Sequence, residues 1–267
     1  MPMQNEKNSI KSTFKRPYTL FSSFFFDPLR LIKKIKGLPF FIINLGRYER
    51  LRRAGYFKFR LLDARYASYD RFGKAANVDG HYFLQDLWAA EFLHKNNIKE
   101  HVDIGSRLDG FIAHILLFCK VAYIDILPLD IRMDGLSFRQ GSILNLPFED
   151  NSVNSLSSLH VIEHIGLGRY GDPVDPDGYL KAAGELARVL KPGGHLLMST
   201  PVGGRERLCF DTQRIFDPQT ILDAFKPLRL VEFLLIDDKG KGIIKDASMD
   251  CARRCNYGCG LFVFTKG

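Results

Sequence analysis

From about residue 80 onward, segments with a helical spacing of apolar residues alternate with short, continuously apolar runs. The helical segments span residues 82–97, 111–119 and 178–190, and the last ends at the stop and turn signal Lys191-Pro192-Gly193-Gly194. The apolar runs predict strands over residues 101–104, 121–125, 138–140, 153–159, 195–200, 228–236 and 261–265. This alternation is typical of a parallel α/β sheet. The last two strands lack a helical crossover, so we expect them to pair antiparallel.

The composition is that of a globular protein with one large domain and an appendage. The chain has 267 residues, of which 46% are hydrophobic and 25% charged, which excludes wholesale disorder, a collagen-like fibre and a coiled coil. No apolar run approaches the roughly 20 residues of a transmembrane helix. The longest runs, residues 20–26 and 38–45, are stopped by Asp27-Pro28 and Gly46-Arg47, and no small-residue cleavage pattern follows the first. We therefore expect an intracellular, cytoplasmic protein.

The positive charge is concentrated at the N-terminus. Residues 1–60 contain fourteen Lys and Arg against three acids and carry +11, whereas residues 61–267 carry −3. Clustered phenylalanines, leucines and isoleucines lie between these bases. Such a segment can lie on an anionic membrane surface, bind nucleic acid, or pack its apolar residues on the domain. We predict a basic, aromatic N-terminal extension over residues 1–60, with peripheral contact at the inner membrane surface as an open alternative, and a single domain over residues 61–267.

The five cysteines are odd in number and are not spaced like a disulfide framework. Cys251, Cys255 and Cys259 recur every four residues. However, metal sites usually show close C-x-x-C pairs or nearby histidines, and neither is present in this stretch. We therefore predict reduced thiols and no metal site.

A glycine loop that begins at Gly105 follows the first predicted strand. Asp125, twenty residues after Gly105, ends the second predicted strand. Gly105 permits a tight turn and the close approach of a ligand beside the positive end of the next helix. A carboxylate at Asp125 can accept both ribose hydroxyls of an adenosine cofactor. The alternative for Asp125 is a turn cap beside Pro128.

These motifs resemble those of class I S-adenosylmethionine-dependent methyltransferases. In that superfamily the first strand ends in an acid and a loop like G-x-G-x-G. Here Arg107 replaces the second glycine and Gly110 lies one residue beyond the third. Relatives often have an acid where Ser142 stands, which takes the adenine amino group, and a serine can still accept that hydrogen bond. The Glu163-His164 pair after the fourth strand and the Lys191-Pro192-Gly193-Gly194 turn are also typical of the superfamily.

The resemblance implies a Rossmann-like α/β fold with a seven-stranded, mostly parallel sheet and an antiparallel last strand. It also implies S-adenosyl-L-methionine as cofactor. The cofactor contacts implied lie in the loop after the first strand, at the end of the second strand and in the segment bordering the adenine. They are Asp103, Gly105, Ser106, Arg107, Gly110, Asp125, Ile126, Ser142, Ile143 and His160.

A narrower resemblance covers roughly residues 80–265. The run from Ser158 to Pro173 looks like the signature of the domain-of-unknown-function 268 family. Further similar blocks are Gln85-Asp86-Leu87-Trp88, Asp103 to Gly110, Pro201-Val202-Gly203 and Tyr257-Gly258-Cys259-Gly260. Members look like methyltransferases and often stand beside surface-glycan biosynthesis genes. The altered glycine loop is then a trait of the family.

Candidate catalytic residues follow the fourth predicted strand, where ligands bind in this fold. They are His160, Glu163, His164 and Asp172. Methyl transfer to a hydroxyl requires positioning and a base. His160 is the first candidate because histidine titrates near neutrality, and Asp172 is the second. In the alternative interpretation His160 bonds only backbone, Glu163-His164 caps a short helix, and Arg169 pairs with Asp172. Arg107, Arg169 or Arg205 could hold an anionic substrate in a bidentate manner.

The leading functional hypothesis is a methyltransferase acting on a hydroxyl of a sugar or a lipid-linked glycan. An RNA methyltransferase is an alternative that the basic extension permits. The slightly acidic domain and its lack of an aromatic RNA-reading motif disfavour nucleic acid as a partner. The third hypothesis is a non-catalytic Rossmann module that binds a nucleotide or a protein partner. Nicotinamide-dependent redox chemistry is disfavoured because G-x-G-x-x-G is absent.

Overall fold

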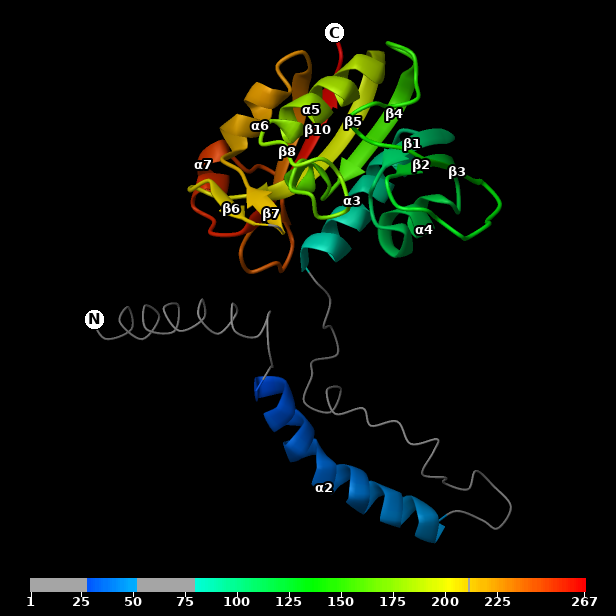
Figure 1. Ribbon diagram of the computed structural model, residues 1–267, viewed down its shortest axis with the longest axis vertical. Helices are drawn as coiled ribbons and strands as arrows, with labels where there is room; N and C mark the ends of the chain where they lie inside the picture. The colour runs from blue at the N-terminus through cyan, green and yellow to red at the C-terminus, as the bar shows by residue number, and fades with distance from the viewer. Residues whose placement is uncertain (1–27, 52–79, 211) are drawn as a thin grey trace, which may run out of the picture. The chain divides into compact units, whose positions relative to one another are not determined.

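The structure is a computed structural model that describes residues 28–51, 80–210 and 212–267 (Figure 1). The chain divides into two units between Asn77 and Val78, and the candidate site lies within the second. The domain boundary predicted at residues 60 and 61 lies outside the described residues, and so does most of the predicted extension.

The first unit contains one described helix, α2 (Pro28–Leu51), with Pro39 inside it. Large apolar side chains along the helix are exposed, namely Leu31, Ile32, Ile35, Leu38, Phe40, Ile42, Ile43, Tyr48 and Leu51. In the parts of the chain that the structure describes, no helix combines the length and apolar character needed to cross a membrane. The sequence did not predict this helix because Gly37, Pro39 and Gly46 interrupt it and such residues oppose helix formation.

The second unit is built on an eight-stranded sheet in the order β3-β2-β1-β4-β5-β10-β8-β9. Its strands are β1 (Glu100–Ile104), β2 (Lys120–Asp125), β3 (Leu136–Gln140), β4 (Val153–Leu159), β5 (Leu190–Val202), β8 (Arg229–Ile236), β9 (Ile243–Ile244) and β10 (Gly258–Thr265). Strands β1 to β5 pair in parallel, whereas β10 runs antiparallel to both β5 and β8. The predicted antiparallel pairing of the last two strands is confirmed. The short edge strand β9 is an addition to the seven predicted strands.

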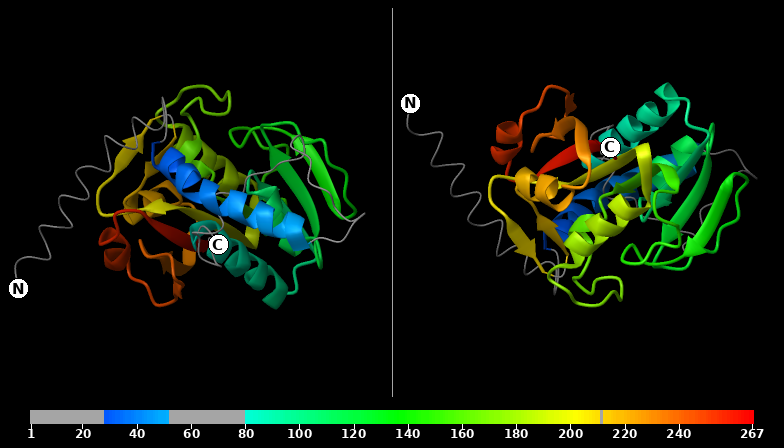
Figure 2. Two further views of the ribbon diagram at one scale, coloured as in Figure 1. Left: turned by 90° about the horizontal axis from the view of Figure 1, so that it is seen from below. Right: turned by 90° about the horizontal axis from the view of Figure 1, so that it is seen from above.

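Helices cover both faces of the sheet (Figure 2). One face carries α3 (Gly80–Lys95), the π-helical turn η3 (Leu108–Ile112) and α4 (Ala113–Ile115), and the other carries α5 (Gly178–Val189) and α6 (Pro218–Ala224). Strand β10 shows why two cores form. Its alternate side chains Leu261 and Val263 join the core beneath α3, whereas Phe262 and Phe264 join the core beneath α5 and α6, as the two-residue period of a strand requires.

The remaining elements lie near the carboxyl end of the parallel strands or close to β10. They are the 3-10 turn η4 (Ile162–His164), the hairpin of β6 (Arg207–Cys209) and β7 (Gln213–Ile215), and α7 (Met249–Arg253). The helix predicted over residues 111–119 begins earlier, as the π-turn η3, in which the N–H of Ala113 reaches the carbonyl of Leu108, and it ends earlier, at Ile115. Single π-turns are often found at functional sites, and this one follows directly on the glycine loop.

Candidate functional site

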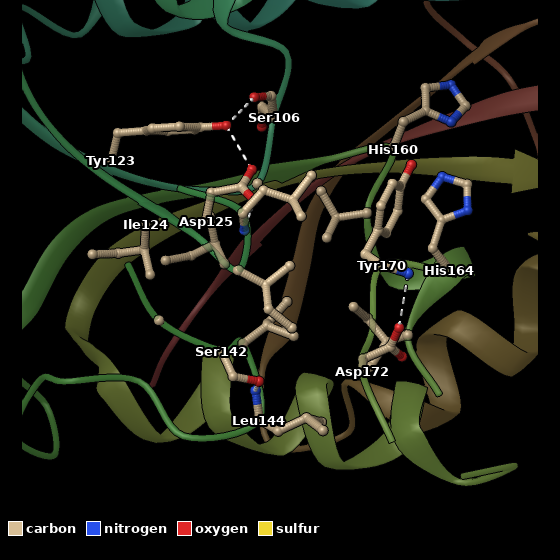
Figure 3. Close-up of a pocket in the computed structure, with 18 of the residues that line it drawn as sticks. Ser106, Tyr123, Ile124, Asp125, Ser142, Leu144, His160, His164, Tyr170 and Asp172 are labelled. Carbon is tan, nitrogen blue, oxygen red and sulfur yellow. Dashed lines mark hydrogen bonds between the residues drawn. The ribbon is translucent and has the colours of Figure 1, made fainter. Parts of the chain in front are cut away.

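A cavity of about 260 Å³ lies at the carboxyl ends of β1, β2 and β4 (Figure 3). Four segments form its wall: the loop after β1, the end of β2, the residues after β3 and the loop after β4. Strands β1 and β4 are neighbours, whereas β2 and β3 continue the sheet beyond β1. The cavity therefore lies at the switch point where open α/β sheets bind their ligands.

The glycine loop owes its shape to Gly105. This residue has φ of +72°, and a Cβ atom there would lie 3.2 Å from the side chain of Val161. Its N–H donates to the carbonyl of Ile124 at 2.9 Å, which ties the loop to β2. Glycine therefore satisfies both the left-handed backbone and the close packing at the floor of the cavity.

Asp103 lies beneath this loop and outside the cavity wall. Its carboxylate accepts hydrogen bonds from the N–H of Ser106 at 3.0 Å, from the hydroxyl of Ser106 at 2.6 Å and from the hydroxyl of Ser157. Burial raises the pKa of Asp103 to about 7, although the hydrogen bonds from Ser106 and Ser157 lower it. The structure thus places this predicted cofactor residue in a role that shapes the loop.

Asp125 presents its carboxylate at the end of β2, on the cavity wall. One oxygen accepts from the N–H of Leu127 at 2.8 Å, and the other lies 2.8 Å from the hydroxyl of Tyr123. That hydroxyl is also 3.0 Å from the carbonyl of Ser106, so it joins the ends of β1 and β2 (Figure 3). Both carboxylate oxygens are therefore held in fixed positions.

The other predicted cofactor residues separate into two groups. Ser106, Arg107, Ile126, Ser142, Ile143 and His160 line the cavity with Gly105 and Asp125. Gly110 does not, because it packs against the Asp86 carboxylate, which a Cβ atom would overlap. The guanidinium of Arg107 donates to Asp109 at 2.8 and 3.0 Å and lies over the ring of Tyr82 at 4.9 Å.

His160 adopts an unusual backbone conformation directly after β4. Among the described non-glycine residues, only Asn97, Asn151 and His160 have positive φ, a region that few non-glycine residues occupy, although asparagine and histidine do so more often than most. The N–H of His160 donates to the carbonyl of Ser199 at 3.0 Å, which holds the residue against β5. Strained backbone of this kind is concentrated at functional sites.

The ring of His160 is paired with a buried carboxylate. Its Nδ1 lies 2.6 Å from Oε1 of Glu163, whose side chain is fully buried. The other oxygen of Glu163 accepts from the hydroxyl of Thr200 at 3.3 Å. Burial opposes charge on both groups. Cys259 and then Glu163 nevertheless hold the pKa of His160 well above its usual value, and the attraction of His160 holds the pKa of Glu163 below its usual value. The predicted catalytic residue Glu163 is therefore a support for His160 and does not line the cavity.

His164 and Asp172 line the cavity, but their side chains form hydrogen bonds with backbone groups. Nδ1 of His164 lies 2.6 Å from the carbonyl of Thr212. The Asp172 carboxylate accepts from the N–H of Gly166 at 2.7 Å and from that of Tyr170 at 3.3 Å. Asp172 thus organises the loop after η4, and its hydrogen bonds support this structural role rather than the predicted role of a base.

Arg169 does not form the ion pair with Asp172 that the alternative interpretation of the sequence predicted. Its guanidinium lies over the ring of Tyr170 at 5.0 Å and donates to the carbonyl of Thr212 at 3.1 Å. Arg205, predicted with it as an anion ligand, is exposed and does not line the cavity.

Sequence reasoning missed a group of residues around His160. The ring of His81 stacks on that of His160 at 5.8 Å and on that of Tyr257 at 5.1 Å, and the ring of Tyr82 lies 5.0 Å from that of His160. Cys259 is buried beside them. These residues come from α3, from β10 and from Tyr257 directly before β10, far from β4 in the sequence. One sequence signal for these residues existed: the block Tyr257-Gly258-Cys259-Gly260, which is part of the resemblance to the family.

Comparison with known proteins identifies the fold. Residues 145–228 match the model of a family described as Caenorhabditis protein of unknown function, DUF268. The [4+2]-cyclase SpnF has a similar structure, with a TM-score of 0.50, 15% identity, and coverage of 68% of this chain and 79% of that one. No curated protein matches the sequence.

Two methyltransferases have related structures. The N-methyltransferase NodS from Bradyrhizobium japonicum WM9, in complex with S-adenosyl-L-homocysteine, has a TM-score of 0.47 at 19% identity, and the match covers 68% of this chain and 84% of that one. An S-adenosylmethionine-dependent methyltransferase from Clostridium acetobutylicum ATCC 824 has a TM-score of 0.48 at 13% identity, and the match covers 72% of this chain and 94% of that one. The predicted Rossmann-like methyltransferase fold is confirmed by the strand order and the SpnF likeness, and residues 145–228 within it carry the match to the DUF268 family.

Proposed function

We propose that the protein is an S-adenosylmethionine-dependent methyltransferase that acts on a hydroxyl group of a sugar or of a lipid-linked glycan. The observation that carries the proposal is the position of Asp125 across from the Gly105 loop, at the switch point of the sheet. A carboxylate fixed at this point suits the two ribose hydroxyls of an adenosine cofactor. Ser142 and Ile143 on the adjoining wall suit the adenine.

The acceptor is expected on the His160 side of the cavity. In the proposed reaction the acceptor oxygen attacks the sulfonium methyl group, the carbon–sulfur bond breaks, and the sulfur leaves as a neutral thioether. The proton of the acceptor passes to a base. Since Nδ1 of His160 faces Glu163, Nε2 is the nitrogen that can take it, and it can do so only in the neutral form of the ring.

Calorimetric titration of the full chain with S-adenosylmethionine, S-adenosylhomocysteine and NAD tests the cofactor. We expect both adenosyl ligands to bind and NAD to show no heat. Binding of NAD alone, or of none of the three, would refute the proposal. Release of S-adenosylhomocysteine in the presence of lipid-linked glycans, free sugars or RNA then identifies the acceptor, and turnover with RNA alone would favour the RNA methyltransferase.

A lipid-linked acceptor would explain the surface of α2. Exposed apolar residues such as Ile35 and Ile42 share this helix with the exposed bases Lys36, Arg47 and Arg50. Such a helix suits the surface of a membrane rich in anionic lipids, where each base contributes about 1 kcal/mol. We therefore include peripheral contact with an anionic membrane in the proposal.

Co-sedimentation of the full chain with vesicles tests this contact. We expect binding to vesicles containing phosphatidylglycerol, weaker binding at high salt, and a loss of binding in the double variant Ile35→Asp, Ile42→Asp. Leu117→Asp is the matched control, because Leu117 is equally apolar and 87% exposed but belongs to the second unit. Equal sedimentation of the double variant and the control would refute the contact.

A further inference from the structure

Three potential metal ligands from three separate elements meet beside the cavity. His81 lies in the first turn of α3, His160 directly follows β4, and Cys259 is the second residue of β10. Strand β10 is antiparallel to β5 and pairs Cys259 with Pro201. Its beginning therefore lies at the edge where β4 and β5 end. One ligand atom from each of the three residues lies within 4.8 Å of the others.

The ring of His160 supplies an independent sign that something binds here. Its Nδ1 faces Glu163 at 2.6 Å, whereas Nε2 is buried and has no hydrogen-bond partner. The side chain is only 4% exposed, so bulk water does not satisfy that nitrogen. Buried polar atoms are nearly always paired, and an exception calls for an unseen ligand or ion.

The chemistry of the three groups selects the ion. A cysteine thiolate and two imidazoles form a soft, nitrogen- and sulfur-based ligand set, which zinc prefers over calcium or magnesium. Three protein ligands with a free fourth position are the pattern of catalytic zinc sites. The sulfur of Cys259 lies 3.8 Å from the carbonyl of Gly260 and also interacts with the ring of His160, and metal binding can replace both contacts.

Glu163 completes this arrangement. Histidines that bind zinc commonly donate their second ring nitrogen to a carboxylate, which fixes the tautomer and the ring orientation. Glu163 has this position relative to His160, and Thr200 holds its other oxygen. The ring of Tyr257, stacked on His81, adds an aromatic wall. We propose that His81, His160 and Cys259 bind one Zn²⁺ ion, with Glu163 supporting His160 from behind.

Zinc at this point would border the cavity, because His160 is part of its wall. A hydroxyl group at the open fourth position would lose its proton more readily, since zinc lowers the pKa of a bound hydroxyl. This consequence rests on the proposed methyltransferase function, but zinc binding itself does not. Zinc would also occupy Nε2 of His160, so metal binding and action of that nitrogen as the base exclude each other.

Metal analysis of the full chain tests the proposal. We expect about one equivalent of zinc per chain after incubation with Zn²⁺ and gel filtration. Cys259→Ser and His81→Asn should lose it, and Glu163→Gln should weaken zinc affinity about 10–100-fold, as typical for a group behind a ligand. The controls Cys209→Ser and His114→Asn alter exposed residues outside the group and should retain zinc. A wild-type zinc content no higher than that of Cys259→Ser overturns the proposal.

Replacement of zinc by Co²⁺ gives a second readout that does not depend on the folding of variants. We expect the intense visible bands of tetrahedral cobalt and a thiolate-to-cobalt charge-transfer band, both of which remain in Cys251→Ser. A cobalt complex without the thiolate band also overturns the proposal. Calorimetry with S-adenosylhomocysteine, repeated after zinc removal, separates the two ideas, because a failure of the metal site leaves cofactor binding unchanged.

Discussion

Glu163 accepts the hydrogen bond of His160 Nδ1 at 2.6 Å, and neither side chain is more than 4% exposed. His160 directly follows β4, and Glu163 lies in η4. His160 has a left-handed backbone with φ of +55°, and its ring faces Glu163. In Figure 3 the ring of His160 extends away from Asp125. One of its nitrogens lies within 4.8 Å of the ligand atoms of His81 and Cys259.

Removal of the negative charge of Glu163 should disturb the tautomer of His160. In the wild-type chain Nδ1 carries the proton that faces Glu163, whereas in Glu163→Gln the amide can present either an acceptor or a donor to the ring. Two-bond proton–nitrogen spectra of labelled histidine report which nitrogen is protonated. At a pH above the pKa of His160, we expect a single Nδ1–H form in the wild type and in the exposed control Glu149→Gln, and a mixture in Glu163→Gln. Identical spectra for all three would mean that Glu163 does not fix the ring.

Substitution of Asp125 should weaken cofactor binding without loss of the fold. Asp125→Asn keeps an oxygen for the N–H of Leu127 but removes the charge that the ribose hydroxyls would meet. A hydrogen bond to a charged group contributes about 1.5–3 kcal/mol, so the dissociation constant for S-adenosylhomocysteine should rise about 10–150-fold. Calorimetry measures this change, and Asp130→Asn, an exposed residue outside the cavity wall, serves as control. An unchanged affinity would remove Asp125 from the cofactor site.

Variants of Asp172 distinguish a loop-organising residue from a base. Asp172→Ala leaves the N–H groups of Gly166 and Tyr170 without their acceptor and should lower the free energy of unfolding by about 1–3 kcal/mol. Asp172→Asn retains one acceptor oxygen and should lose less stability and little activity. Denaturant unfolding gives the first comparison and methyl transfer the second. Loss of activity in Asp172→Asn with unchanged stability would restore Asp172 as the base.

His101 should make the domain sensitive to acid. Its two ring nitrogens lie 2.7 Å from the hydroxyls of Ser155 and Ser157, and burial lowers the pKa of His101 to about 3. The unfolded ring binds a proton below about pH 6.5. The unfolded state therefore holds more protons than the folded state between about pH 6.5 and 3. As the pH is lowered through this interval, the contribution of His101 to the free energy of unfolding falls by up to about 1.4 kcal/mol per pH unit.

Asp103 acts in the opposite direction. Its folded-state pKa of about 7 exceeds the unfolded value near 3.9, so this group makes the folded state more stable as the pH falls through that interval. Between about pH 6.5 and 4 the two contributions nearly cancel in the wild type. As the pH is lowered from 7 to 4, the free energy of unfolding measured from unfolding curves should therefore fall more steeply in Asp103→Asn than in the wild type, and should rise relative to the wild type in His101→Asn. The same slope for all three chains would contradict both assignments.

The sheet could be predicted from the sequence because its strands are short apolar runs with clear limits. Residues 153–159 were predicted and found as β4. Helix α5 was predicted because Leu186 and its apolar neighbours follow helical spacing and Gly193-Gly194 follows its end. Helix α6 was not predicted, although Asp217 caps it and Pro218 begins it, which is a known start signal.

The cavity wall was predicted better than the chemistry beside it. Gly105 and Asp125 are separated by one strand–helix unit, so their spacing in the sequence determines their positions. His81 and Cys259 reach His160 only through the packing of α3 and the pairing of β10. No local spacing encodes such a meeting. Gly110 and Asp103 were assigned to the cofactor because a motif shows which residues recur, not whether each one faces the ligand or the loop.

The position of β10 determines when this domain can fold during synthesis. It is the last of the eight strands in sequence order, yet it lies between β5 and β8 in the sheet, and every one of its residues is buried. A nascent chain that has not reached Gly258 leaves the facing edges of β5 and β8 unpaired, and such edges recruit strands from other molecules. The ribosome must therefore release β10 before the sheet can close. A slow stretch of translation ahead of this strand would prolong the interval in which the chain is prone to aggregate.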